Sequence, residues 1–517
     1  MTAPADWQEI IAGAVIPGLL ARAAEDRPGS PYCEFGGSVT TVGELAAHVD
    51  AAAARLAARG VRGGDRVAVL LPNHPDHVVV ILALIVLRAT WLPVNPRLRG
   101  AALGHVLRDG DPALILVDRT HADLVGEPGP PVIVRDRAGD RPDLSWLGEP
   151  GGPVPAHSAG PEDVVALIYT SGTTGPAKGV QVTDRMLRTS ALGVLFTTAP
   201  AEGEVFFLWE PLCHVGGAQM LFVPLLRPVS LAMVEKFSAS RFWDQVRESG
   251  ATHVHQLGGI LQVLLNRPPS EAEFSHRLRM AWGGGVTTGT WLEAERRFGL
   301  RIAECYGQTE ASSFLTVNTE GPQAGVGRVL PYLRAAVQDE DGAEVPTGES
   351  GEIVVRTAGL PVVTPGYFRD EEKSAAARRG GWWRTGDLGR FDEHGNLHFI
   401  GRAVDSVRRR GENVSAWEVE TVINTHPAVA ESAMIGVPAE IGEQDIKVFI
   451  RPATGAGLDA AELIHWCAER LADFQMPRYV AFVADFPRTP SERVIKSRLP
   501  RSVEDCFDAW TMERTQP

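Results

Sequence analysis

The run YTSGTTGPAKGV at residues 169–180 constrains the fold of this chain more than any other segment. It follows a short apolar stretch, 164–168, that has the composition of a buried strand. Glycine lets the backbone turn tightly after that strand, while hydroxyl, amide and ammonium groups donate hydrogen bonds to an anion. The residues concerned are Thr170, Ser171, Gly172, Thr173, Thr174, Gly175 and Lys178. A strand that ends in such a loop predicts a phosphate-binding turn.

A polar surface turn has a similar composition, so the loop alone leaves two interpretations open. The Walker A pattern GxxxxGK[ST] does not fit residues 169–180. The function therefore has to be inferred from this loop together with other motifs.

Composition narrows the class of protein. At 517 residues the chain exceeds what one hydrophobic core usually serves, and its 44% hydrophobic content can fill two or more domains. The formal net charge is −14 at pH 7. Nonspecific binding to DNA or to an anionic membrane needs concentrated Lys and Arg, so we expect neither nucleic acid nor a membrane as a partner.

The cysteines and the N-terminus indicate a cytoplasmic location. The cysteines are Cys33, Cys213, Cys305, Cys467 and Cys506. They are scattered and have no CxxC spacing, so they indicate neither a disulfide framework nor a zinc site. The N-terminus lacks the pattern of a signal peptide, and the apolar run 78–87 is too short to cross a bilayer. We expect a buried helix over that run.

Apolar strands alternate with Ala-rich helical stretches, as in a layered α/β fold. The pattern predicts a helix over 45–58 and strands over 66–71, 113–117, 132–134 and 397–400.

A domain boundary is expected near 401–405, which gives domains of 1–403 and 404–517. In the second, strands around 432–437 and 446–450 precede a helix over 460–474 that is capped by Asp459. The C-terminal part therefore reads as a small α+β domain.

Two motifs follow the loop in a fixed order: YGQTE at 306–310, and WRTGDL at 383–388 with Gly401 and Arg402 after it. Together the three segments resemble the adenylate-forming, or AMP-binding, superfamily, which contains acyl-CoA and aryl-CoA ligases, peptide-synthetase adenylation domains and luciferases. Further matching segments are LLPN at 70–73, PLCHVGG at 211–217, GGG at 283–285, GVGR at 325–328 and RRRGENVSAWEVE at 408–420. The resemblance implies a large N-terminal domain of several α/β sheets and a small mobile C-terminal α+β domain, with the site between them.

The resemblance also implies roles for single residues. Thr170 to Lys178 would hold the phosphates of ATP, Thr309 would contact the α-phosphate, and Glu310 would help to hold Mg²⁺. Asp387 and Arg402 would bind the ribose. The adenine and its surroundings would involve Tyr306, Gly307, Gln308, Gly283, Gly284 and Gly285. Taken singly, Asp387 also fits a turn cap, Tyr306 a core aromatic and Arg402 a surface ion pair; the ordered set favours the nucleotide site.

The C-terminal motif departs from the family. Residues 487–499 read PRTPSERVIKSRL, where the family usually has a Gly-Lys pair whose lysine bridges the acyl carboxylate and the α-phosphate. Glu492 and Arg493 occupy those places. Arginine keeps the charge, but its planar fork is not equivalent to an ammonium. Three outcomes stay open: Arg493 does the work, Lys496 replaces it, or the activated group is less demanding than an ordinary carboxylate.

The expected hinge differs as well, because Val404 stands where the family usually places an acidic residue, and Asp405 follows it. A β-branched residue absorbs a hinge rotation less readily, so the rotation would pivot at Asp405 or be restricted. Val404 would otherwise simply pack between the domains.

The acceptor and the acid are inferred less directly. Arg408, Arg409 and Arg410 with Gly411 resemble a loop used in thioester formation, although a solvated charged loop fits equally well. Segment 408–420 looks closest to carnitine-type and aryl-type CoA ligases. By family position the candidates for the acid pocket are His214, Met220, His255, Gln256, Leu257 and Trp282, with Gly283 to Gly285, unless these glycines serve only the adenine. Two histidines and a glutamine favour a small, polar or aromatic acid, unless His255 and Gln256 only satisfy backbone groups.

We therefore expect an ATP- and Mg²⁺-dependent, AMP-forming ligase that joins such an acid to coenzyme A. The expected catalytic residues are Arg493, Lys496, Thr174, Glu310 and His214. One alternative is a diazotase-like enzyme of secondary metabolism that activates nitrite for an aryl amine, and another is an amide-forming enzyme. A regulator that has lost turnover is disfavoured by the intact Thr174, Glu310, Asp387 and Arg402. Chains of this kind often form homodimers.

Overall fold

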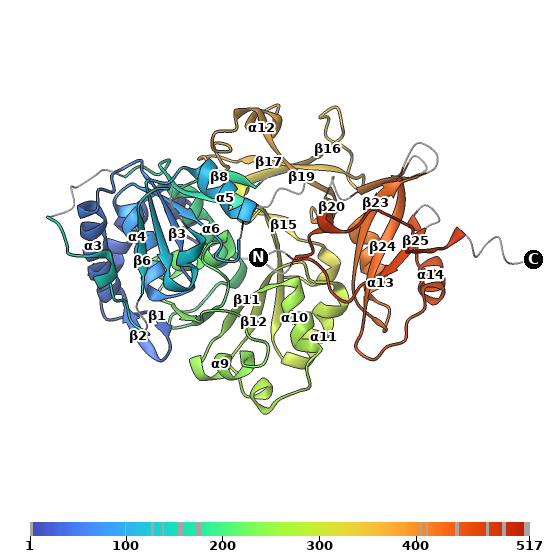
Figure 1. Ribbon diagram of the computed structural model, residues 1–517, viewed down its shortest axis with the longest axis horizontal. Helices are drawn as coiled ribbons and strands as arrows, with labels where there is room; N and C mark the ends of the chain where they lie inside the picture. The colour runs from blue at the N-terminus through green and yellow to red at the C-terminus, as the bar shows by residue number, and fades with distance from the viewer. Residues whose placement is uncertain are drawn as a thin grey trace, which may run out of the picture. The chain divides into compact units, whose positions relative to one another are not determined.

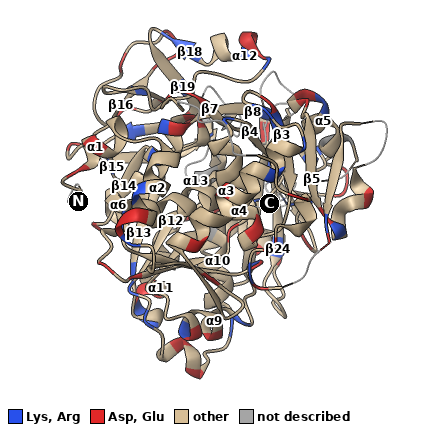
Figure 2. Ribbon diagram, turned by 90° about the vertical axis from the view of Figure 1, so that its left-hand side faces the viewer, with Lys and Arg blue, Asp and Glu red and all other residues tan. Residues whose placement is uncertain are grey.

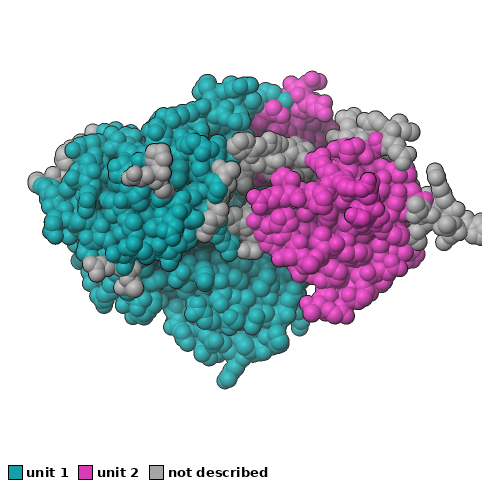
Figure 3. Space-filling model, viewed as in Figure 1, with its two compact units in different colours: residues 1–335, 355–383 teal, residues 336–354, 384–517 magenta. Residues whose placement is uncertain are grey.

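The computed structural model describes residues 4–98, 100–125, 129–136, 139–152, 159–170, 177–402, 406–409, 412–439, 444–471, 475–488 and 493–510. The chain divides into two compact units (Figure 3). Unit 1 comprises Met1–Ala335 and Val355–Trp383, and unit 2 comprises Ala336–Val354 and Arg384–Pro517. The expected boundary at 403/404 falls within unit 2, and residues 403–405 lie outside the described ranges, so that boundary stays a prediction.

One sheet of unit 1 carries the predicted phosphate loop. Its order is β6-β5-β3-β4-β7-β8, with β8 antiparallel to β7. The strands are β3 (Arg66–Leu70), β4 (Thr90–Pro93), β5 (Leu114–Asp118), β6 (Val132–Arg135), β7 (Val164–Thr170) and β8 (Lys178–Thr183). The accompanying helices are α3 (Val42–Ala58), α4 (Pro75–Val86) and α5 (Gly100–Gly110), shown in blue in Figure 1. The strands expected at 66–71, 113–117 and 132–134 and the helix at 45–58 are confirmed.

Local chemistry explains where these helices begin. Thr41 and Glu44 form a reciprocal capping box at the start of α3. His74 caps α4, and Pro75 occupies its first turn, where a missing N–H costs nothing. α4 carries the apolar run that was expected to be a buried helix, and its residues from Pro75 to Ile85 are buried. No described helix is long and apolar enough to span a membrane.

The other large sheet of unit 1 has the order β15-β14-β13-β12-β11-β9-β10-β1-β2. Its strands are β1 (Pro31–Phe35), β2 (Ser38–Thr41), β9 (Val205–Leu208), β10 (Ser230–Met233), β11 (His253–Leu257), β12 (Met280–Gly284), β13 (Arg301–Tyr306), β14 (Thr316–Asn318) and β15 (Arg328–Val329). From β1 through β10, β9, β11 and β12 to β13, neighbouring strands are parallel. Long crossovers with helices make this possible.

Helices cover both faces of this sheet. On one face lies a cluster in which Val254, Ala281 and Ile302 from the strands pack with Leu261 and Trp291 from helices. The helices of that layer, green in Figure 1, are α9 (Phe242–Ser249), α10 (Gly258–Leu265) and α11 (Thr288–Phe298). The buried helix α6 (Asp184–Thr198) contacts β12 and β14. The N-terminal helices α1 (Trp7–Ala12) and α2 (Ile16–Asp26) also pack in this unit, α1 against α6.

The chain passes between the units within three strands: β16 (Leu333–Gln338), β17 (Gly351–Thr357) and β19 (Trp382–Phe391). These strands form a sheet of order β16-β17-β19-β18, where β18 is Arg378–Arg379, and β20 (Leu397–Arg402) pairs with β19. The strand expected at 397–400 is thereby confirmed. The short helix α12 (Glu371–Ala376) precedes β18.

The remainder of unit 2 is a small α+β assembly. Its elements are β21 (Ser406–Arg409), β22 (Glu412–Ser415), α13 (Ala416–Asn424), β23 (Val429–Pro438), β24 (Gln444–Pro452), α14 (Ala460–Ala468), β25 (Tyr479–Phe482) and β26 (Phe507–Asp508). The sheet order is β23-β24-β25-β26, and one cluster packs Val419 and Ile423 of α13 with Leu463 of α14 against it. The strands at 432–437 and 446–450 are confirmed.

The expected helix over 460–474 is too long. Asp459 caps α14 as predicted, accepting from the N–H of Ala461 at 3.2 Å. The helix ends at Ala468, and just after it the N–H of Arg470 bonds to the carbonyl of Cys467, three residues earlier, in a 3₁₀-type turn. Residues 472–474 of the expected helix lie outside the described ranges.

Charges of both signs are interspersed along the chain. Figure 2 shows Lys and Arg (blue) and Asp and Glu (red) distributed over the elements in view.

Candidate active site

The carboxyl ends of parallel strands gather several of the predicted site residues at one edge of the sheet in unit 1. Register places His255 of β11 opposite Trp282 of β12, and Gln256 opposite Gly283. Tyr306 ends β13, next to β12. In open α/β sheets, ligands bind outside the carboxyl ends of the strands. This edge is therefore the natural place for a ligand in unit 1.

The glycines at the end of β12 are required by the strands themselves. A Cβ at Gly283, whose φ is +155°, would lie 1.7 Å from the backbone oxygen of Gln256. A Cβ at Gly307 would lie 2.0 Å from the backbone oxygen of Ser313. Real Cβ atoms do not approach so closely, so these positions need glycine before any ligand is considered. Gly284 and Gly285, also predicted for the nucleotide, lie in the same segment as Gly283.

Glu310 is held in place by the segment around Tyr367. It lies in the short helix η5 (Thr309–Ala311), is 7% exposed, and accepts a 3.0 Å hydrogen bond from the Tyr367 hydroxyl. The N–H of Thr364 donates to the Glu310 backbone oxygen at 2.8 Å. The ammonium of Lys178 lies 4.8 Å from the centroid of the Tyr367 ring. Tyr367 thus links the predicted phosphate-binding lysine to the predicted metal-binding carboxylate.

The turn after Glu310 is strained. Ser312 and Ser313 have φ values of 56° and 70°, in the left-handed region that ordinary residues avoid. The Ser312 hydroxyl donates to the Val362 carbonyl at 2.6 Å, which helps to hold the turn. Such outliers persist where the surroundings fix them and are frequent at functional sites. Thr309 and Gln308 lie directly before this turn, and Thr309 is buried.

The predicted phosphate loop is described only at its two ends. Thr170 and Lys178 are paired across the antiparallel strands β7 and β8, so the loop begins and ends at one point. Ser171, Gly172, Thr173 and Thr174 lie outside the described residues. His105 of α5 contacts the Ala177 carbonyl at 2.8 Å through its Nε2, which fixes the end of the loop.

Glu304, which the sequence reasoning missed, supports the end of β12. Its carboxylate accepts from the N–H of Gly285 at 2.6 Å, and that of Val286 lies 3.4 Å away. Burial raises the pKa of Glu304 to about 8, because the charged form is poorly solvated there and two backbone N–H groups only partly offset the effect. The protonated form therefore dominates at neutral pH.

The structure brings some of the predicted acid-pocket residues together and separates others. The rings of His255 and Trp282 have centroids 4.2 Å apart. Gln256 follows His255 in the strand, so its side chain points to the opposite face. Its amide oxygen and nitrogen are buried and have no partner among the described residues.

The remaining pocket candidates lie on separate segments. His214 begins helix α7 (Val215–Ala218), and its Nε2 lies 3.2 Å from the Asn95 side-chain nitrogen. Met220 is 1% exposed within η3 (Gln219–Phe222), so it is a core residue in this conformation. Leu257 is the last residue of β11.

Unit 2 brings Asp387 and Arg402 together directly. They are register partners across the antiparallel strands β19 and β20, with Arg402 Nε 3.4 Å from an Asp387 carboxylate oxygen. Asp387 is 5% exposed, and its N–H donates to the Thr385 hydroxyl oxygen at 3.1 Å. A buried carboxylate next to a guanidinium that is 39% exposed can accept hydroxyl donors while the arginine reaches the same ligand.

The two candidates for the missing lysine differ in environment. Lys496 forms a 2.7 Å ion pair with Glu420, whose carboxylate also accepts from the N–H of Met434. Arg493 is exposed. It precedes Val494, whose backbone forms an isolated antiparallel β-bridge with Arg488. Residues 489–492, including Glu492, lie outside the described ranges. Lys496 is thus part of the packing of unit 2, whereas Arg493 reaches its surface.

The expected hinge and the arginine loop are only partly described. Val404, Asp405, Arg410 and Gly411 lie outside the described residues. Arg408 belongs to β21 and has Asn413 of β22 as its register partner. Their expected roles stay predictions.

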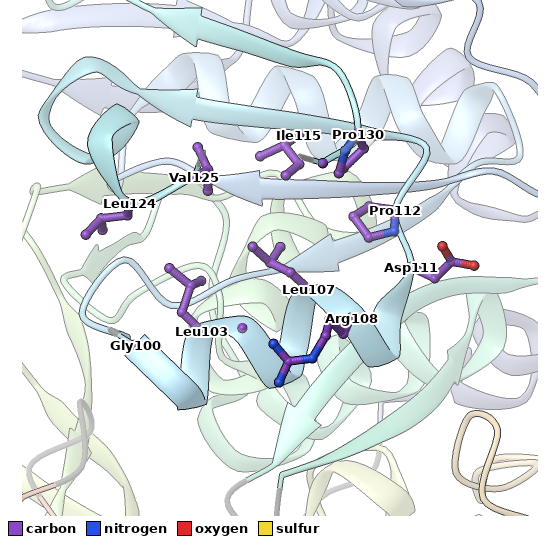
Figure 4. Close-up of a pocket in the computed structure, with 12 residues that line it drawn as sticks. Gly100, Leu103, Leu107, Arg108, Asp111, Pro112, Ile115, Leu124, Val125 and Pro130 are labelled. Atoms are coloured by element: carbon purple, nitrogen blue, oxygen red, sulfur yellow. The ribbon is translucent and has the colours of Figure 1, made fainter. Parts of the chain in front are cut away.

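A cavity of about 500 Å³ lies elsewhere in unit 1 (Figure 4). Leu103, Leu107 and Ile115 supply much of its apolar lining, and Arg108 and Asp111 lie on the same side of it in Figure 4. None of the predicted site residues lines it.

The described residues contain no group of three or more His, Cys, Asp or Glu side chains that could hold a metal ion. Mg²⁺ at nucleotide sites is usually bound by one or two carboxylates together with substrate phosphates and water. A single buried carboxylate such as Glu310 therefore fits Mg²⁺ that arrives with a nucleotide.

Sequence reasoning missed Tyr367 and Glu304, which contact predicted residues, and Glu210, whose carboxylate bonds to Nδ1 of His255. Tyr367 lies in the segment TPGYFRD, where the Pro-Gly pair is only a turn signal. Glu304 precedes the YGQTE motif by two residues within its strand. A lone acidic residue in an apolar strand is a signal that could have been followed, because a buried acid needs a partner.

The matches to known families cover most of the chain. Residues 20–368 match the family of AMP-binding enzymes, and residues 418–493 match the AMP-binding enzyme C-terminal domain. Feruloyl-CoA synthase from an Amycolatopsis species is 31% identical over 488 residues, which cover 93% of this chain and 97% of the synthase. Crotonobetaine/carnitine–CoA ligase from Salmonella typhi is 28% identical over 464 residues, covering 85% of this chain and 89% of the ligase.

Solved structures agree with this. ATP-bound MatB from Rhodopseudomonas palustris is 29% identical with a TM-score of 0.83, covering 93% of this chain and 97% of MatB. The o-succinylbenzoate CoA synthetase MenE from Bacillus subtilis, in complex with an acyl-adenylate intermediate, is 25% identical with a TM-score of 0.83 over 96% of this chain and 99% of MenE. The α/β fold with a large N-terminal and a smaller C-terminal part is thereby confirmed, as is the family resemblance. This chain belongs to the AMP-binding enzyme family and is an adenylate-forming enzyme.

Proposed function

We propose that this protein is an ATP-dependent, AMP-forming ligase that adenylates a small or aromatic carboxylic acid and transfers it to coenzyme A. The arrangement of Lys178, Tyr367 and Glu310 at the strand edge carries the proposal, since it sets a cation and a buried carboxylate around one tyrosine. The names of both relatives, a CoA synthase and a CoA ligase, support the acceptor.

Each part of the nucleotide has its own proposed residues. In unit 1, Thr170 to Lys178 would bind phosphates, Thr309 the α-phosphate, and Tyr306 with Gly307, Gln308 and the segment Gly283 to Gly285 the adenine. In unit 2, Asp387 would accept from the ribose hydroxyls with Arg402 beside it, an orientation that their cross-strand pairing favours. We extend the proposal to a domain boundary at 403/404 and to a mobile C-terminal domain.

The chemistry needs positioning more than covalent catalysis. A carboxylate oxygen attacks the α-phosphorus, negative charge gathers on the phosphoryl oxygens, and pyrophosphate leaves. Mg²⁺ bound at Glu310 would supply positive charge to the phosphates. Lys178, Thr174 and the backbone N–H groups of the loop would donate to the same oxygens, and His214 would lie near the acid.

Arg493 is the residue that we place at the acyl carboxylate and α-phosphate. Its side chain is exposed at the surface of unit 2, next to the isolated β-bridge between Arg488 and Val494, which supports this. Lys496 is the weaker candidate, since moving it would break its ion pair with Glu420. A planar guanidinium also binds a carboxylate and a phosphate oxygen at once.

The test is identification of products. The purified protein is incubated with ATP, Mg²⁺ and aryl or short-chain acids, with and without coenzyme A, and products are identified by mass. The proposal predicts AMP, pyrophosphate and a CoA thioester whose formation needs no nitrite.

Parallel reactions with nitrite and aminoaryl acids test the diazotase-like alternative. Loss of the amino nitrogen as N₂, or a diazonium adduct, would replace the proposed acceptor chemistry. AMP release with neither product would point to amide or ester formation. If the reactions with coenzyme A and the reactions with nitrite gave products at equal rates, the enzyme would use a broader range of acceptors than proposed.

A further inference from the structure

A buried acid–histidine pair lies at the strand edge of unit 1, and the adenylation chemistry itself does not require it. Glu210 follows β9 closely and is 4% exposed, and His255 in β11 is 9% exposed. A carboxylate oxygen of Glu210 bonds to Nδ1 of His255. The Trp282 ring, with its centroid 4.2 Å from that of His255, covers the histidine from β12.

The surroundings hold both members of the pair. The Asn73 side chain donates to the Glu210 backbone oxygen at 2.7 Å, and the Trp209 indole donates to the His255 backbone oxygen at 2.7 Å. A Cβ at Gly216 would lie 2.9 Å from the Glu210 carboxylate, so the glycine leaves room for it. Burying an acid and an imidazole costs free energy unless they are paired, so the pair is a specific arrangement rather than an accident of packing.

The pairing determines what His255 presents to a ligand. Because the Glu210 carboxylate accepts the proton on Nδ1, the neutral imidazole carries no proton on Nε2, which is then an acceptor. No hydrogen bond to Nε2 is made by the described residues.

This environment selects for a hydrogen-bond donor. A substrate ring without a donor would leave Nε2 desolvated and unpaired, whereas a second carboxylate would be repelled by Glu210. A phenolic hydroxyl or an aryl amino group would satisfy Nε2. Resting on the proposed function, we propose that His255, oriented by Glu210, recognises a hydroxyl or amino donor on the ring of an aromatic acid substrate.

The experiment measures acid-dependent pyrophosphate release by the full-length enzyme, a readout that needs no acceptor. The acids are matched sets: 4-hydroxy-, 4-amino- and 4-methylbenzoate, and the same three substituents on cinnamate. We expect the hydroxy or amino member of at least one set to exceed its methyl counterpart by at least about tenfold in kcat/KM, since a site built around a donor discriminates strongly against its absence. Comparing kcat/KM for the hydroxy and amino acids of each set shows whether a phenol or an amine is recognised.

Substitutions test the residues. His255→Leu removes the acceptor and should bring the donor-to-methyl ratio close to one, whereas His255→Gln keeps a carbonyl acceptor and should retain part of the preference. Glu210→Leu should lower the ratio as His255→Leu does, and Glu210→Gln should preserve more of it. A purely structural defect would lower both acids equally and leave the ratio unchanged. His276→Gln, at a histidine that precedes β12 at its amino end, is the matched control and should keep the wild-type ratio.

Two results would overturn the inference. The first is a donor-to-methyl ratio of kcat/KM near one for wild type with both the benzoates and the cinnamates. The second is a His255→Leu variant that keeps the full wild-type ratio. Absence of pyrophosphate release with every donor-bearing acid would overturn it too. Failure of the proposed function looks different, because pyrophosphate would then be released with the expected preference while no CoA thioester forms.

Discussion

In the proposed reaction, we expect the rate of the first step to depend on Arg493. Replacing it by Ala removes the only described cation placed at the acyl carboxylate in the proposal, so acid-dependent pyrophosphate release should fall by about a hundredfold to a thousandfold in kcat. Arg493→Lys keeps the charge and should retain more activity than Arg493→Ala.

The matched control for Arg493 is Lys496→Ala. Since Lys496 is paired with Glu420 at 2.7 Å, its loss should lower the apparent melting temperature and leave pyrophosphate release within a few-fold of wild type. If Lys496→Ala abolishes turnover while Arg493→Ala does not, the role at the acyl carboxylate and α-phosphate belongs to Lys496 instead of Arg493.

Glu304 gives a pH-dependent prediction at the same scale. Its pKa is raised from 4.5 to about 8, so the folded protein binds this proton more tightly than the unfolded chain does. Its contribution to stability is complete below about pH 4.5 and is lost as the pH rises towards 8, at about 1.4 kcal/mol per pH unit. Glu304→Gln keeps an acceptor for the N–H of Gly285 without ionising.

Thermal melts of wild type and Glu304→Gln at several pH values test this. Glu304→Gln should gain stability relative to wild type between pH 5 and pH 8, because only the wild type must ionise a buried carboxyl. A constant difference across that range would show that Glu304 ionises without cost in the folded protein.

At the scale of elements, the close approach of β11 and β12 depends on one glycine. A methyl group at residue 283 would meet the Gln256 backbone oxygen at 1.7 Å, so Gly283→Ala must push the strands apart and should cost several kcal/mol of stability. Gly289→Ala in α11 meets nothing within 4 Å and should stabilise the protein by up to about 1 kcal/mol. Chemical unfolding of both variants checks the contrast; equal effects would contradict the packing role of Gly283.

Elements were predictable from sequence where local patterns dominate. The capped helix α3, the apolar α4 and the strands β3 and β5 follow from periodicity and end signals. The helix α14 ends earlier than its pattern suggests, at a local turn after Cys467 that the apolar periodicity does not mark. The cross-strand partnership of Asp387 with Arg402 needed the antiparallel register of β19 and β20, although both residues had been singled out.

At the scale of the whole molecule, several motifs in a fixed order identify the family, because a chance match to all of them is improbable. What the motifs cannot supply is long-range contact: Tyr367 reaches Glu310 across 57 positions, and Glu210 reaches His255 across 45. Such partners lie in segments without a pattern of their own. We expect the choice of acid to depend on such contacts, which is why sequence reasoning left the acid as a class.

The central claim is that the chain binds ATP through Lys178, Tyr367 and Glu310. Isothermal titration calorimetry of the intact protein with ATP and Mg²⁺ tests it most directly, with Tyr367→Phe as the variant and Tyr332→Phe, a buried tyrosine whose hydroxyl lies 3.5 Å from the Phe314 carbonyl, as the control. We predict saturable binding by wild type and the control, and affinity weakened by about two- to tenfold in Tyr367→Phe, as expected for one lost hydrogen bond. No heat of binding from wild type with either ATP or AMP would contradict the account.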